Sequence, residues 1–86
     1  MGNKEANQLK MLGVAIRGAR LSMGYSQEVL AEMVDCHRNY VGNVERGEQN
    51  MTVKMLFRFA TAMSRPASSL IRDAEGAVQS ITRKRL

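Results

Sequence analysis

Cys36 and His37 are adjacent residues whose side chains could take part in chemistry. A thiol beside an imidazole suggests nucleophilic catalysis or metal binding. Neighbouring residues at the start of a helix point in different directions, however, and no third group in the sequence orients this pair. With one cysteine and one histidine in the chain, a four-ligand zinc site of Cys/His type is excluded. We therefore expect no enzyme, no metal and no cofactor, and we assign Cys36 to packing in a turn.

The chain carries an excess of positive charge. Thirteen Lys and Arg residues against eight Asp and Glu give a net charge of +5 and a pI near 10. This balance favours a polyanionic partner such as DNA, RNA or an acidic membrane surface. No apolar run approaches the roughly 18 residues of a membrane helix, and no hydrophobic block follows the first lysine as in a signal peptide. The sequence predicts one small cytoplasmic domain that does not enter a membrane.

Apolar residues recur at spacings of three and four along most of the chain, which is typical of amphipathic helices. The first predicted helix ends at Gly24, and Ser26 caps the second. The third runs from about residue 37 to 46 and is terminated by Gly47. Thr52 caps the fourth, and Pro66 lies in the first turn of the fifth. Alternating β-branched runs are absent, so the predicted fold class is all-α with five helices.

These patterns divide the chain into three parts. Residues 1–8 form an N-terminal extension, residues 9–72 the helical domain, and residues 73–86 either a short helix or a disordered tail. Apolar residues in the last part keep helical spacing, at Ala74, Val78 and Ile81. Gly76 and the basic end of the chain weaken that helix, and terminal residues without a core are usually mobile.

The stretch QEVLAEMVDCHRNYVGNVER, residues 27–46, holds two short helices joined by about three residues, which is the geometry of a helix-turn-helix. The small Ala31 suits the point where two steeply crossing helices approach most closely. With LGVAIRGARLSMGYSQEVLAEM before it and LFRFATAM after it, this stretch resembles the phage repressor and Cro-type (Xre) family of transcriptional regulators, which includes restriction-modification controller proteins. The resemblance runs from about Leu12 to Ile71. Asp35 stands where that family usually has glycine, and aspartate tolerates the left-handed conformation.

The resemblance implies a compact lambda-repressor-like domain whose third helix lies in the major groove of double-stranded DNA. Arg38, Asn39 and Asn43 would then face the base edges. Arginine can donate two hydrogen bonds to guanine, and asparagine can pair in bidentate fashion with adenine. Gly42 would lie outward and let the helix approach the DNA closely.

Contacts with phosphates are implied at a second group of residues, Gln27, His37, Tyr40, Arg46, Asn50, Thr52 and Lys54. Each has a structural alternative. Gln27, His37 and Thr52 could serve only as helix caps, and Arg46 and Lys54 could be solvated charges.

By the same resemblance, Arg20 and Glu45 form a partly buried ion pair that joins the first helix to the third.

A single domain contacts only a few base pairs, so we expect a homodimer on a pseudo-palindromic operator. The predicted dimer interface consists of Leu70, Ile71, Val78 and Ile81. An alternative remains open, in which the chain is an antitoxin or adaptor whose main partner is a toxin-like protein. RNA polymerase is a further candidate partner of a regulator.

Overall fold

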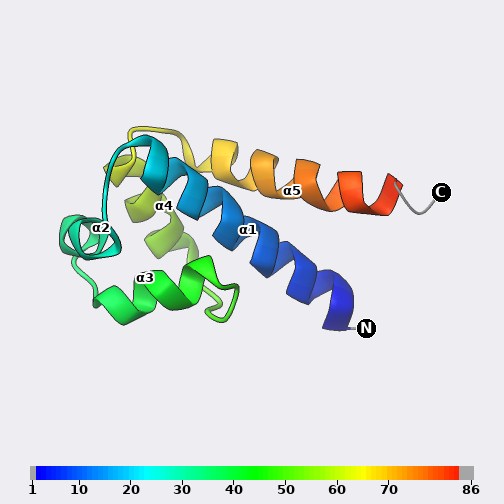
Figure 1. Cartoon of the computed structure of the whole chain (residues 1–86), viewed down its shortest axis with the longest axis horizontal. Coiled ribbons are helices and arrows are strands. Elements are labelled where there is room, and N and C mark those ends of the chain that lie inside the picture. Colours follow the sequence, from blue (N-terminus) through cyan, green and yellow to red (C-terminus); the bar gives the residue numbers. More distant parts are fainter. Residues whose placement is uncertain (1, 84–86) are drawn as a thin grey trace.

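The computed structural model describes the backbone of residues 2–83 and the side chains of residues 4–78. Within this part the chain forms five helices and no strand: α1 (Gly2–Ser22), α2 (Gln27–Val34), α3 (Arg38–Glu45), α4 (Val53–Ala62) and α5 (Ala67–Arg83). The short helices α2, α3 and α4 gather at one end of the molecule, where α1 and α5 pack on them (Figure 1). The predicted all-α fold of five helices is confirmed.

The starts of two helices follow local capping rules. The Ser26 hydroxyl oxygen accepts a hydrogen bond from the Val29 backbone N–H at 3.0 Å and so starts α2. The Thr52 hydroxyl oxygen accepts one from the Met55 backbone N–H at 3.1 Å and starts α4. Each cap satisfies an amide that has no partner inside the helix.

The turns between helices use the left-handed backbone region. Gly24 and Gly47 have φ of 76° and 77°, as expected for glycines that end helices. Asp35 ends α2 with φ 57° and ψ 56°, and its N–H donates to the Glu32 carbonyl at 3.2 Å. The aspartate therefore takes the conformation that the family usually assigns to glycine, as the sequence predicted.

The two long helices differ from the prediction. Helix α1 already begins at Gly2, so residues 2–8 of the predicted N-terminal extension are helical. Helix α5 begins after Pro66 and continues without a break to Arg83, so residues 73–83, for which a short helix or a tail was predicted, belong to the same helix as residues 67–72. In α5 the continuation is supported by burial, because Ala74 is only 6% exposed. Its packing offsets the helix-weakening effect of Gly76.

The core takes one fully buried side chain from each helix. These residues are Ile16, Leu30, Val41, Phe59 and Leu70, each 0% exposed. Burial of side chains of this size contributes about 1.5 to 3 kcal/mol each. Because every helix contributes, the core holds α3 against the remaining helices and leaves its opposite face at the surface. No helix in the described part of the chain is long and apolar enough to cross a membrane.

Candidate nucleic-acid interface

Helix α3 has one face in the core and one at the surface. Val41 and Val44 point inward and are 0% and 3% exposed. Arg38 and Asn39 are exposed at the N-terminal end of the helix. The His37 ring nitrogen Nδ1 accepts a hydrogen bond from the Asn39 backbone N–H at 3.0 Å, so His37 is the N-cap of α3. Of the two roles predicted for His37, helix cap and phosphate contact, the structure shows the helix cap.

A buried ion pair joins α1 to the end of α3. Arg20 Nε donates to Glu45 Oε2 at 2.6 Å, and Arg20 Nη2 donates to Glu45 Oε1 at 3.0 Å. Arg20 Nη1 donates to the Tyr25 carbonyl at 2.8 Å. The hydrogen bond with Glu45 raises the pKa of the Arg20 guanidinium above its ordinary value. These contacts satisfy both charges, which is what burial requires.

Gln27 extends this network to α2. Its Nε2 donates to Glu45 Oε1 at 3.0 Å, and its side chain is half-buried. The amide that the resemblance assigns to a phosphate is thus engaged within the protein. It ties the start of α2 to the end of α3 and thereby sets the relative position of the two helices.

The residues proposed to read bases have different surroundings. Arg38 Nε lies 3.2 Å from Glu28 Oε2, and the two side chains are 54% and 65% exposed. Asn43 is half-buried, and its Oδ1 accepts a hydrogen bond from Arg46 Nη2. Arg46 Nε also donates to Glu48 Oε1 at 3.1 Å. Asn43 and Arg46 are therefore paired with each other in the free protein.

Gly42 requires a correction to the sequence prediction, whereas the phosphate contact of Tyr40 stays a prediction. Gly42 is buried, and a Cβ there would lie 3.1 Å from Arg46 Nη1. Gly42 therefore lies on the outward side of α3 but is covered by the Arg46 side chain, so in the free protein it does not open the helix to a close approach of DNA. Tyr40 is half-buried and packs edge-on against Phe59, with ring centroids 6.1 Å apart. Burial raises the pKa of its hydroxyl.

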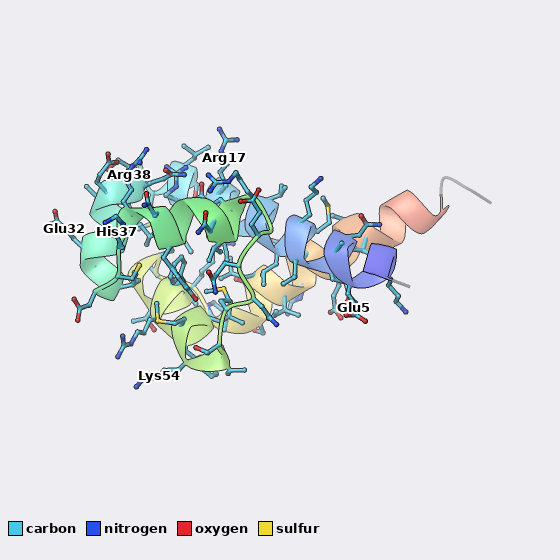
Figure 2. All side chains as sticks on the ribbon, turned by 90° about the horizontal axis from the view of Figure 1, so that it is seen from below. Glu5, Arg17, Glu32, His37, Arg38 and Lys54 are labelled. Carbon is cyan, nitrogen blue, oxygen red and sulfur yellow. The ribbon has the colours of Figure 1, made fainter. Side chains whose placement is uncertain are left out.

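The remaining phosphate candidates lie outside α3. Thr52 caps α4, Lys54 is exposed in the first turn of α4, and Asn50 lines the groove between α1 and α5. Figure 2 shows Lys54 on the opposite side of the molecule from Arg38 and Arg17. Arg17, an exposed residue of α1, was not among the predicted site residues. Glu28, in the first turn of α2, was not assigned a role at this surface either.

Helices α1 and α5 enclose a groove of about 840 Å³. Its apolar lining residues are Leu9, Leu12, Ile71, Ala74 and Val78. Of the predicted interface residues, Ile71 is 37% exposed, whereas Leu70 is fully buried in the core of its own chain. Leu70 is therefore not available to a partner. The side chain of Ile81 lies outside the described residues.

The surroundings of Cys36 do not favour nucleophilic chemistry. Burial, with a smaller effect from the charge of Asp35, raises the pKa of the Cys36 thiol. A raised pKa keeps the thiol protonated, whereas a nucleophile needs the thiolate. In the part of the chain that is described, no cluster of three or more His, Cys, Asp or Glu residues could hold a metal ion.

Comparison with known proteins places this geometry in a family. Residues 16–70 match the helix-turn-helix family. The chain is 37% identical to control protein C.SmaI of Serratia marcescens over 62 residues, which are 72% of this chain and 74% of that protein.

Two solved structures extend the comparison. The restriction-modification controller protein C.AhdI of Aeromonas hydrophila shows 37% identity and a TM-score of 0.71, covering 72% of this chain and 94% of that one. The controller protein C.Esp1396I, solved as a tetramer with its natural 35-base-pair operator, shows 24% identity and a TM-score of 0.74 over 84% of this chain and 95% of that one. The latter likeness concerns the fold alone. Because the family match spans more than half of the sequence, this chain belongs to the helix-turn-helix family of DNA-binding transcriptional regulators, which are not enzymes.

Proposed function

We propose that the chain regulates transcription by binding a specific pseudo-palindromic operator in double-stranded DNA as a homodimer, with α3 in the major groove. The observation that carries this proposal is the division of α3 into two faces. Its inner face is held by the core and by the Arg20–Glu45 pair, while Arg38 and Asn39 are exposed at its N-terminal end. Both side chains carry N–H groups that can donate hydrogen bonds to acceptors on the base edges. The similarity to C.SmaI and C.AhdI, both controller proteins, supports the same function.

Contacts with phosphates would hold α3 in register. Lys54 is exposed on α4, and Arg17 and Arg38 lie on the other side of the molecule (Figure 2). Cations on both sides of α3 suit the two phosphate backbones that border a major groove. Arg46 would also contact a phosphate, once its guanidinium releases Glu48 and binds the phosphate instead. Gln27 acts indirectly, because its amide is bonded to Glu45.

Two copies of α3 would read two half-sites about one helical turn apart. The interface we propose is centred on Ile71 and Val78, on the rim of the groove between α1 and α5. C.Esp1396I, which shares this fold, was solved as a tetramer with its operator. Burial of apolar groove residues against a second copy is favourable at about 25 cal/mol per Å².

The DNA-binding proposal is tested by selecting bound sequences from random duplex DNA. We expect a symmetric motif, and selection without any enriched sequence would refute sequence-specific binding. With the selected duplex, Arg38→Ala should relax the preference at one base position in each half-site. Lys54→Ala should instead weaken binding to all duplexes alike and flatten the salt dependence by about one phosphate contact. Arg72→Ala, which removes an exposed charge on α5, serves as the matched control.

The homodimer is tested by sedimentation of the protein without DNA. Ile71→Glu should shift the population towards monomer, since it places a charge in an apolar contact. Val53→Glu, at a site that is 68% exposed on α4, should leave the assembly unchanged. A monomeric parent protein, or a dimer that Ile71→Glu does not weaken, would contradict the proposed interface.

A further inference from the structure

The contact between Glu28 and Arg38 bears on how Arg38 is oriented. An arginine reads guanine through two parallel hydrogen bonds, for which a planar fork of N–H groups must be held in one direction. Arg38 is 54% exposed, so packing alone does not restrict its long side chain. Its approach to Glu28 is through Nε, at 3.2 Å. This contact is an ion pair, and Arg38 makes no hydrogen bond to any described residue, so both Nη nitrogens keep their donors for another partner.

Glu28 is itself well positioned to act as an anchor. It lies in the first turn of α2, between residues whose side chains are fixed. Ser26 caps the helix through Val29 N–H at 3.0 Å, and Gln27 is bonded to the buried Glu45 at 3.0 Å. A carboxylate in the first turn of a helix is favoured by the helix dipole. The backbone that carries Glu28 is thus held rigidly beside the start of α3.

We infer that Glu28 is a positioning residue for Arg38, whose Nε it attracts by an ion pair so that the two Nη groups face the two acceptors of a guanine. This inference rests on the proposed function, because it requires Arg38 to read a base. Glu28 touches no base in this arrangement and acts through Arg38 alone.

The charge of Glu28 makes the inference testable, because removal of this charge should change the overall affinity for DNA and the preference for guanine in opposite directions. A carboxylate at a DNA-binding face repels phosphates, so its removal strengthens electrostatic binding to any duplex. Removal of a positioning residue also lowers the preference for guanine at the position that Arg38 reads. A carboxylate that acted only through its charge would change all duplexes equally and leave the base preference intact.

The experiment uses the full chain, the selected operator and duplexes that carry each other base at the Arg38-dependent position. Glu28→Gln keeps the side-chain length and removes the charge. We expect the guanine preference at that position to fall by about threefold to fivefold, the size of an exposed ion pair, while binding to non-operator DNA tightens. An unchanged preference with uniformly tighter binding would overturn the inference. Melting temperatures show that the variant is folded.

Glu32→Gln is the matched control, because Glu32 is an exposed glutamate of the same helix. Its side chain points away from Arg38 (Figure 2). We expect no base-specific change from this substitution. A loss of guanine preference equal to that of Glu28→Gln would mean that the charge of α2, and not the contact with Arg38, sets the preference, which overturns the inference.

A combined variant separates this inference from the proposed function. In an Arg38→Ala background, Glu28→Gln should no longer alter the base preference, because the residue it positions is absent. A remaining base-specific effect would show that Glu28 acts on bases directly and would overturn the positioning role. If Arg38→Ala changes the preference at no position, base reading by Arg38 fails, and the positioning role fails with it. If only Glu28→Gln has no effect, base reading by Arg38 stands.

Discussion

Helix α3 has an arginine–glutamate pair on each side, and the two pairs lie in different surroundings. On the inner side, Arg20 Nε and Glu45 Oε2 are 2.6 Å apart, with side chains 8% and 3% exposed. On the outer side, Arg38 Nε and Glu28 Oε2 are 3.2 Å apart, with side chains 54% and 65% exposed. The same two residue types therefore form a desolvated contact in one region and a solvated contact in the other.

The difference in burial separates structural from functional roles. A desolvated charge must keep its partner, because breaking the pair leaves the other charge without water or counter-charge. A solvated charge can exchange its partner for another at little cost. The inner pair consequently fixes α3 in the fold, and the outer arginine remains able to bind a new acceptor.

The largest expected effect comes from breaking the inner pair. Arg20→Leu or Glu45→Leu alone should lower the free energy of unfolding by about 3 to 5 kcal/mol, because one buried charge is left unpaired. The double variant should lose less than the sum of the single variants. Chemical denaturation of the three variants measures this. A double variant as unstable as the sum would mean that the two residues act independently.

A smaller effect is expected at Gly13, where α1 approaches the end of α3. A Cβ there would lie 2.5 Å from the carbonyl oxygens of Val44 and Glu45, and backbone atoms cannot rotate away. Gly13→Ala should therefore destabilise the protein by about 1 to 3 kcal/mol. Gly18→Ala is the control, since a Cβ there has nothing within 4 Å. It should stabilise α1 by about 0.5 to 1 kcal/mol. Equal melting temperatures for the two variants would contradict the close approach.

The smallest effect is expected for the outer pair. A double-mutant cycle of Glu28→Ala and Arg38→Ala, measured by denaturation, should give a coupling of about 0.2 to 1 kcal/mol that salt weakens. Arg38→Ala should thus leave the fold stable while it alters DNA binding. A coupling as large as that of the inner pair would remove the distinction between the two sides of α3.

Much of the fold could be predicted because its signals are local. Ser26 and Thr52 start helices, Gly24 and Gly47 end them, and Asp35 adopts the left-handed conformation. Each of these depends on a few neighbouring residues and on backbone geometry. The family resemblance added the arrangement of the helices, because a helix-turn-helix has a conserved spacing of core and turn positions.

The candidate site was harder to predict, because the spacing of residues along the sequence does not reveal which groups a side chain contacts or covers. Gly42 shares a helix face with outward residues, yet the Arg46 side chain covers it. Gln27 was assigned to a phosphate, yet its amide reaches Glu45. Leu70 was assigned to a dimer interface, yet it is fully buried in its own chain.

The amino-acid sequence by itself determined the helical class, the helix-turn-helix and the chemical types displayed by α3, since these depend on periodicity, caps and residue identity. Only the tertiary structure decided how far α1 and α5 extend, since α5 continues past residue 72 with Ala74 buried, and burial of this kind stabilises a helix more than local propensity does. The family resemblance already implied the buried Arg20–Glu45 pair, whereas only the structure revealed the exposed contact between Arg38 and Glu28. Solvent access, a property of the assembled helices, distinguishes the arginine that holds the fold from the arginine proposed to read DNA.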